Sequence, residues 1–133
     1  SGVESFVRRC AATCRGNHYV TTLHSINSAV VKLGKLTKPT RVFRGISGAR
    51  MPKAFTTTSE TGIRGGIEQA FTSTTKERDV AMAYASNKSG GGGGGGPGSG
   101  VLLEMQMGMI DRGADLTWLS QYPHEQEILF APL

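Results

Sequence analysis

The chain has 133 residues, of which 38% are hydrophobic and 19% are charged, so its size fits one domain with a core of its own. No apolar run approaches the ~20 residues that a membrane-spanning helix needs, and no signal peptide is visible. Fifteen Lys and Arg against ten Asp and Glu give a net charge of +5, which favours anionic partners such as nucleic acid, acidic lipid or a nucleotide. Because the basic residues are scattered, without interleaved aromatic residues, we do not expect specific nucleic-acid binding.

The chain has two cysteines, Cys10 and Cys14. Four residues apart on a predicted helix, they share a face, but helix geometry suits a disulfide between them poorly. No cluster of Cys and His has the spacing of zinc ligands, so the sequence predicts no metal site. Two reduced thiols favour an intracellular setting and leave the compartment otherwise unknown.

The first part of the chain is predicted to contain two helices and a strand. Residues 3–16 form the first helix, and residues 18–34 the second, because apolar residues recur there at helical spacing and Gly34 can end the helix. After Pro39, residues 40–44 are expected to form a short strand.

The next segment is predicted to combine a strand and a helix. Residues 63–72 alternate between apolar and polar and contain a Gly-Gly pair, which indicates a strand with a bulge or a close backbone approach. A helix follows as far as about Ser86, with Thr74 or Thr75 as its cap. Glu77 stands three residues after Thr74, as a capping box requires.

The last part of the chain is predicted to be a glycine-rich loop followed by short strands. Residues 90–100 are almost entirely glycine, and this composition predicts a flexible surface loop over residues 89–100. Short strands mixed with helices, without regular βαβ alternation, indicate an α+β fold in a single domain over residues 1–133. The expected elements after the loop are a strand over 101–107, a turn at 111–113, a loop or short strand over 116–122 and a strand over 127–130.

Two glutamates near the C-terminus, Glu125 and Glu127, carry the strongest functional signal. If a strand begins at Glu127, its two-residue period sends both carboxylates to one side and Gln126 to the other. Like charges side by side repel each other, so folding gains nothing from the pair unless it binds or reacts with something. The plainer alternative is a solvated start of a strand.

Three segments along the chain together resemble the Arg-Ser-Glu class of mono-ADP-ribosyltransferases, which includes arginine-specific vertebrate enzymes and bacterial toxins. The resemblance implies an ADP-ribosyltransferase-like fold, in which two small antiparallel sheets pack face to face, helices flank them and NAD lies in the cleft. It covers roughly residues 18–133. The three segments are Phe43-Arg44-Gly45, residues 71–75 (Phe-Thr-Ser-Thr-Thr) and Glu125-Gln126-Glu127, with further likeness over residues 65–68, 79–84 and 110–115.

The resemblance implies a role for each charged residue. Glu127 would stabilise the oxocarbenium ion that forms when nicotinamide leaves NAD, and would hydrogen-bond a ribose hydroxyl. Glu125 would pair with the guanidinium of an acceptor arginine and orient or deprotonate the attacking nitrogen. Arg44 would clamp the phosphate or nicotinamide-ribose side of NAD.

Neutral residues complete the site that the resemblance implies. Gly45 would let backbone groups approach the nicotinamide amide, Ser73 would hold Glu127 and touch the ribose, and Thr74 would also belong to the NAD site. Tyr122 is a better match than Trp118 for the aromatic residue that meets the acceptor. At Thr75 the family usually has Ser, a mild departure because the hydroxyl is kept.

Plainer explanations remain open for several of these residues. Arg44 is alternatively a surface cation, Ser73 part of a helix cap, and Trp118 and Tyr122 core aromatics. The three histidines are taken as incidental, because Arg44 and Ser73 occupy the places that a His-Tyr-Glu branch of the superfamily would use. These histidines are His18, His24 and His124.

We therefore expect a monomeric, metal-independent enzyme that transfers ADP-ribose from NAD, as co-substrate, to an exposed arginine of a protein and releases nicotinamide. One alternative is an NAD glycohydrolase that uses the same site with water as acceptor. Another is a degenerate module that binds a nucleotide or a protein without turnover. Retention of Arg44, Ser73 and Glu127 argues against the degenerate module.

Overall fold

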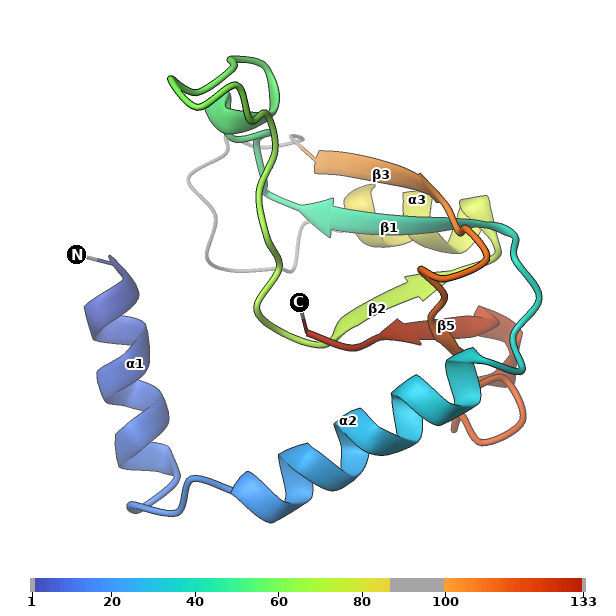
Figure 1. Cartoon of the computed structure of the whole chain (residues 1–133), viewed down its shortest axis with the longest axis horizontal. Helices are drawn as coiled ribbons and strands as arrows, with labels where there is room; N and C mark the ends of the chain where they lie inside the picture. The colour runs from blue at the N-terminus through green and yellow to red at the C-terminus, as the bar shows by residue number, and fades with distance from the viewer. Residues whose placement is uncertain (1, 87–99, 133) are drawn as a thin grey trace.

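The computed structural model describes residues 2–86 and 100–132 (Figure 1). The predicted flexible segment 89–100 lies outside the described residues, except for Gly100, which begins a strand. The helices are α1 (Gly2–Thr13), α2 (Val20–Gly34) and α3 (Arg78–Ser86), with short 3-10 helices η1 (Lys53–Phe55) and η2 (Pro123–Glu125). The strands are β1 (Arg41–Ser47), β2 (Thr72–Thr75), β3 (Gly100–Gln106), β4 (Ala114–Asp115) and β5 (Glu127–Phe130).

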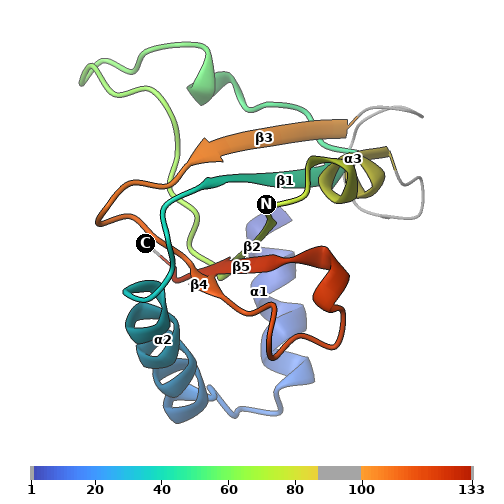
Figure 2. The ribbon, with the colours of Figure 1, turned by 90° about the vertical axis from the view of Figure 1, so that its right-hand side faces the viewer.

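The strands form one antiparallel sheet in the order β3-β1-β2-β5-β4. The predicted α+β class is confirmed, whereas the prediction of two packed sheets is wrong. The reason lies between β1 and β2, which share the single residue pair Phe43–Thr75. This pair joins β3 and β1 edge to edge with β2, β5 and β4, and Figure 2 shows the two groups of strands one above the other.

Helix α3 lies very close to β1 and β3 because two glycines face it. A Cβ atom on Gly45 would stand 1.8 Å from the carbonyl oxygen of Ala81, and one on Gly100 would stand 2.2 Å from that of Ala85. Gly100 pairs with Ser47, two residues after Gly45 on β1. The helix backbone therefore occupies the space that side chains would otherwise fill.

A small apolar core lies at the sheet. Val42 of β1 and Ile128 of β5 are completely buried and cluster with Met107. Met105 and Phe130 pack against this cluster and remain partly exposed. The core thus spans both groups of strands and holds β1 and β5 in fixed positions.

Helices α1 and α2 extend away from the sheet (Figures 1 and 2). Val30 and Gly34 are buried in α2, and a Cβ on Gly34 would stand 2.7 Å from the carbonyl oxygen of Arg112. The C-terminal end of α2 therefore anchors this helix to the segment that precedes β4.

Cys10 and Cys14 are free thiols. Within residues 2–86 and 100–132, no helix combines the length and apolar character needed to cross a membrane.

The predicted strand over residues 63–72 is wrong for all but its last residue, because residues 63–71 are irregular and β2 begins at Thr72. Gly62 and Gly65 have φ angles of +79° and +128°, which strands do not use. Ile63 and Ile67 are exposed. The alternation of apolar residues in this segment therefore marks no buried strand face.

Candidate functional site

A cavity of about 330 Å³ lies between the sheet and α3. It is lined by Arg44, Ser73, Glu125 and Glu127, together with Gly45 and Thr74. Residues from three distant parts of the chain therefore meet at one cavity. Tyr122, which the resemblance assigns to the acceptor, does not line it.

The pairing of β2 with β5 brings Ser73 and Glu127 together. Ser73 pairs with Leu129 and Thr75 pairs with Glu127, so Ser73 and Glu127 are diagonal neighbours on one face of the sheet. The hydroxyl of Ser73 donates a hydrogen bond of 2.7 Å to Glu127 Oε1. The carboxylate of Glu127 is thus held from the neighbouring strand.

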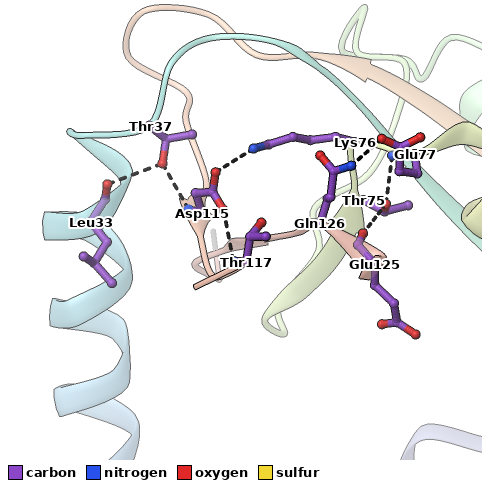
Figure 3. Close-up of polar contacts among 9 residues, drawn as sticks. All are labelled: Leu33, Thr37, Thr75, Lys76, Glu77, Asp115, Thr117, Glu125 and Gln126. Carbon is purple, nitrogen blue, oxygen red and sulfur yellow. Dashed lines mark hydrogen bonds and ion pairs between the residues drawn. The ribbon is translucent and has the colours of Figure 1, made fainter. Parts of the chain in front are cut away.

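Glu125 reaches the cavity by a different route from the one predicted. It ends the 3-10 helix η2, and Gln126 adopts a left-handed conformation with φ 46° and ψ 54°. The two-residue strand period therefore does not apply to the pair, and the turn at Gln126 directs both carboxylates to the cavity instead. Two contacts support this turn (Figure 3): Thr75 Oγ1 donates to the carbonyl oxygen of Glu125, and Gln126 Nε2 donates to Glu77 Oε1.

The hydroxyl-rich end of β2 serves the backbone more than the cavity. Thr74 is buried, and its hydroxyl donates to the carbonyl oxygen of Ile128 at 2.8 Å. Thr75 Oγ1 accepts a hydrogen bond from the backbone N–H of Glu77 at 2.9 Å, just before α3. The predicted capping box of Thr74 and Glu77 is wrong, because the Glu77 carboxylate bonds Gln126 instead.

Tyr84 of α3 also lines the cavity, and the sequence reasoning assigned it no role. Its hydroxyl donates a hydrogen bond of 2.7 Å to Glu125 Oε1. The pKa of Tyr84 is raised above its usual value, mainly by this hydrogen bond. Partial burial and the negative charge of the nearby carboxylates raise this pKa further. Helical spacing is the signal that points to it, because Tyr84 lies one turn after Val80 and Ala81, which also line the cavity.

Arg44 is the cation of the cavity. Its side chain is 29% exposed, and its Nη1 atom lies 3.8 Å from Glu68 Oε2. Glu68 belongs to the irregular segment before β2. Arg44 therefore lies half-buried in the cavity wall, beside a carboxylate of the loop. This position differs from the fully exposed surface cation of the plainer explanation.

Trp118 and Tyr122, the two aromatic residues of the loop before η2, are exposed. Trp118 is 71% exposed and Tyr122 is 53% exposed, so the alternative of core aromatics is wrong for both. The ring of Tyr122 stands edge-on to His124, with 6.1 Å between the ring centroids. Both residues lie on the segment that leads into η2 and Glu125.

A second polar network lies where α2, β4 and the residue after β2 meet (Figure 3). Lys76 Nζ lies 2.6 Å from Asp115 Oδ2, and the backbone N–H of Asp115 donates to Thr37 Oγ1. Burial raises the pKa of Asp115, but hydrogen bonds from Lys76 and Thr117 and the charge of Lys76 outweigh it, so the pKa lies below its usual value. The network ties the end of α2 to β4 and to the residue after β2.

Among the residues that the structure describes, no three His, Cys, Asp or Glu side chains are grouped as metal ligands would be. Comparisons with models of protein families, with curated proteins and with solved structures gave no match. The functional interpretation therefore depends on the residues that line the cavity.

Proposed function

We propose that this protein is a mono-ADP-ribosyltransferase that moves ADP-ribose from NAD to the guanidinium of an arginine side chain. One observation carries the proposal: a single cavity collects Arg44, Ser73, Glu125 and Glu127, with the Ser73 hydroxyl 2.7 Å from Glu127 Oε1. Folding alone gives no reason to gather two carboxylates, their hydroxyl donors and an arginine around an open space.

In the proposed reaction, Glu127 acts on the bond between nicotinamide and ribose. The nicotinamide of NAD is already cationic, so it leaves with the bonding electron pair without a general acid. The ribose that remains has oxocarbenium character, and a fixed carboxylate beside it lowers the energy of that state. Ser73 restricts Glu127 to one orientation, which avoids reorganisation during the reaction.

Arg44 supplies the positive charge for NAD. A planar guanidinium suits phosphate oxygens and ribose hydroxyls in a bidentate way. The cavity volume of about 330 Å³ lies at the lower end of the range for small-molecule sites. We therefore propose that it receives the nicotinamide-ribose end, while the adenosine end lies outside.

Glu125 receives the acceptor. Its carboxylate would pair with the arginine guanidinium and take up the proton that the attacking nitrogen loses as it bonds to the ribose carbon. The products are nicotinamide, ADP-ribosylarginine and a proton. The same cavity with water as acceptor would give NAD glycohydrolase activity, and the partial exposure of Glu125 and Glu127 to solvent favours this as a second activity.

The experiment that tests the proposal measures two products from NAD, with and without agmatine as an arginine analogue. We expect nicotinamide release in both cases and ADP-ribosylagmatine only with agmatine. Glu127→Gln keeps the side-chain shape and removes the charge, so both products should fall by about two to three orders of magnitude. Glu60→Gln is the matched control, because Glu60 is exposed and does not line the cavity.

Two outcomes would contradict this assignment. Wild-type protein that releases no nicotinamide from NAD would exclude both activities and leave the binding module. Glu127→Gln protein that keeps near wild-type nicotinamide release would exclude Glu127 as the catalytic carboxylate.

A further inference from the structure

The two carboxylates of the cavity have separate hydroxyl donors. Glu127 accepts a hydrogen bond from Ser73 on β2, and Glu125 accepts one from Tyr84 on α3, each at 2.7 Å. Ser73 was expected from the resemblance, whereas Tyr84 comes from the structure. The two glutamates are therefore held by different elements.

Tyr84 is well placed to act as a fixed support. Its helix packs backbone-close to β1 and β3 through Gly45 and Gly100, which leaves α3 little room to shift. Tyr84 is 51% exposed and lines the cavity, where an incoming acceptor would pass. The hydroxyl thus stands on a rigid element beside an accessible site.

Glu125 needs such a support more than Glu127 does. It lies at the end of the three-residue helix η2, outside the strand that holds Glu127. Thr75 fixes only its backbone carbonyl, so the orientation of the carboxylate depends on its side-chain contacts. Repulsion from Glu127 would turn an unsupported Glu125 carboxylate away from the cavity.

We infer that Tyr84 is a positioning residue for arginine transfer, whose hydroxyl holds the Glu125 carboxylate towards the cavity so that it can engage the acceptor guanidinium. This inference rests on the proposed function. An ionised carboxylate offers about four acceptor positions, and Tyr84 uses one of them. The positions that remain are sufficient for a bidentate contact with a guanidinium.

The test compares wild-type protein with Tyr84→Phe, which keeps the ring and removes the hydroxyl. Hydrogen bonds to charged groups are typically strong enough that losing one should lower kcat/KM for agmatine transfer by about tenfold or more. The loss should appear mainly as a higher KM for agmatine. Nicotinamide release in water and the KM for NAD should stay within about twofold, since Glu127 and Arg44 are untouched.

Tyr19→Phe is the matched control, because Tyr19 precedes α2 and does not line the cavity. It should leave kcat/KM and KM for agmatine, the KM for NAD and the rate of nicotinamide release unchanged. Unchanged agmatine transfer in Tyr84→Phe would overturn the inference. Equal loss of transfer and of nicotinamide release would also overturn it, because Tyr84 would then support the whole cavity.

A second measurement tests the contact without enzyme activity. The three tyrosines are replaced by 3-fluorotyrosine, whose phenol ionises at lower pH and whose fluorine NMR signal reports that ionisation. The hydrogen bond to Glu125 is the main cause of the raised pKa of Tyr84. Glu125→Gln should therefore lower this pKa. The fluorine signal that is missing from the spectrum of Tyr84→Phe is the signal of Tyr84.

The two measurements separate the two claims. Wild-type protein without nicotinamide release would overturn the proposed function, and the titration would then judge the Tyr84 contact by itself. A Tyr84 pKa that stays the same in Glu125→Gln would overturn the inference even if the wild-type protein transfers ADP-ribose.

Discussion

Arg44 has a carboxylate beside it in this structure, which NAD would have to replace in the proposed reaction. Glu68 lies 3.8 Å from it, and the Glu68 side chain is 55% exposed. Exposed ion pairs of this kind contribute about 0–1 kcal/mol. The diphosphate of a dinucleotide offers a stronger counter-charge, so displacing Glu68 would cost little, and in the proposed reaction Glu68 would compete weakly with NAD for Arg44.

We therefore predict that Glu68→Gln improves NAD affinity. The KM for NAD should fall by about two- to fivefold, which corresponds to the free energy of an exposed ion pair, while kcat stays unchanged. Steady-state kinetics with varied NAD concentration measure both constants, with Glu60→Gln as the control. A higher KM for NAD would show instead that Glu68 orients Arg44 for binding.

The residues of the site differ in how far the sequence predicts them. Ser73 and Glu127 meet because β2 and β5 pair in register, which strand patterns alone do not give, and the resemblance was what indicated that the two residues share a site. Glu125 joins them only through the left-handed conformation of Gln126, which no periodicity indicates. Tyr84 requires knowledge of which face of α3 meets β1, and that depends on tertiary packing.

Packing of α3 against the sheet is the main constraint at the level of elements. The resemblance implied that Gly45 lets backbone groups approach nicotinamide. In the structure, the space beside its Cα is filled by the backbone of α3 at Ala81 and Ala85. Gly45 is therefore needed for the distance between helix and strand, and the cavity wall that carries Tyr84 depends on it.

Replacement of this glycine should be costly. Gly45→Ala would place a methyl group against backbone atoms that cannot rotate away, and overpacking of this kind destabilises by about 1–3 kcal/mol or more. Urea denaturation followed by circular dichroism measures the loss. Gly108→Ala is the control, because the nearest atom to its Cβ would be 3.9 Å away. Equal stability of the two variants would mean that α3 shifts freely.

Elements with strong periodicity were predicted well, and weakly patterned ones were not. The second predicted helix, over residues 18–34, agrees with α2 (Val20–Gly34), because its apolar spacing is sustained over four turns. The two-residue strand β4 was missed, since Ala114 and Asp115 are too few to show a period. The strand predicted before Thr72 does not form. Its apolar residues alternate with polar ones but are exposed, and such a pattern does not indicate pairing with another strand.

At the scale of the whole molecule, the Lys76–Asp115 ion pair connects the segment after β2 with β4 at the sheet edge. The pKa of Asp115 lies below its usual value, so this pair contributes stability above the unfolded pKa of about 4. That contribution is lost as the pH falls through the lower, folded pKa. Both side chains are about one-third exposed, which limits its size.

Lys76→Met should accordingly lower the free energy of unfolding by about 1 kcal/mol or less at neutral pH. The difference from wild type should shrink as the pH falls below the unfolded pKa of Asp115 and disappear in stronger acid. Urea denaturation at a series of pH values measures this. Arg41→Met is the control, because the Arg41–Glu104 pair is more exposed and should contribute less. A difference that grows towards acid pH would contradict the role of Asp115.

The arrangement of the whole sheet was the least predictable feature. The sequence indicates the strands of both groups, but whether they form two sheets or one depends on a single contact, Phe43 with Thr75. A contact of one residue pair leaves no periodic trace in the sequence. The α+β class follows from local patterns, whereas the joining of the sheet follows from tertiary geometry.

Gln126, the left-handed residue between the two glutamates, separates two structural elements, η2 and β5. Glu127 begins strand β5 of the sheet, while Glu125 ends η2, which follows an exposed loop. Substitutions in that loop can therefore alter the surroundings of Glu125, while Glu127 stays bonded to Ser73 on β2. In an enzyme of the proposed kind, donor chemistry and acceptor choice could then diverge independently, since changes in the loop leave the bond-breaking carboxylate where it is.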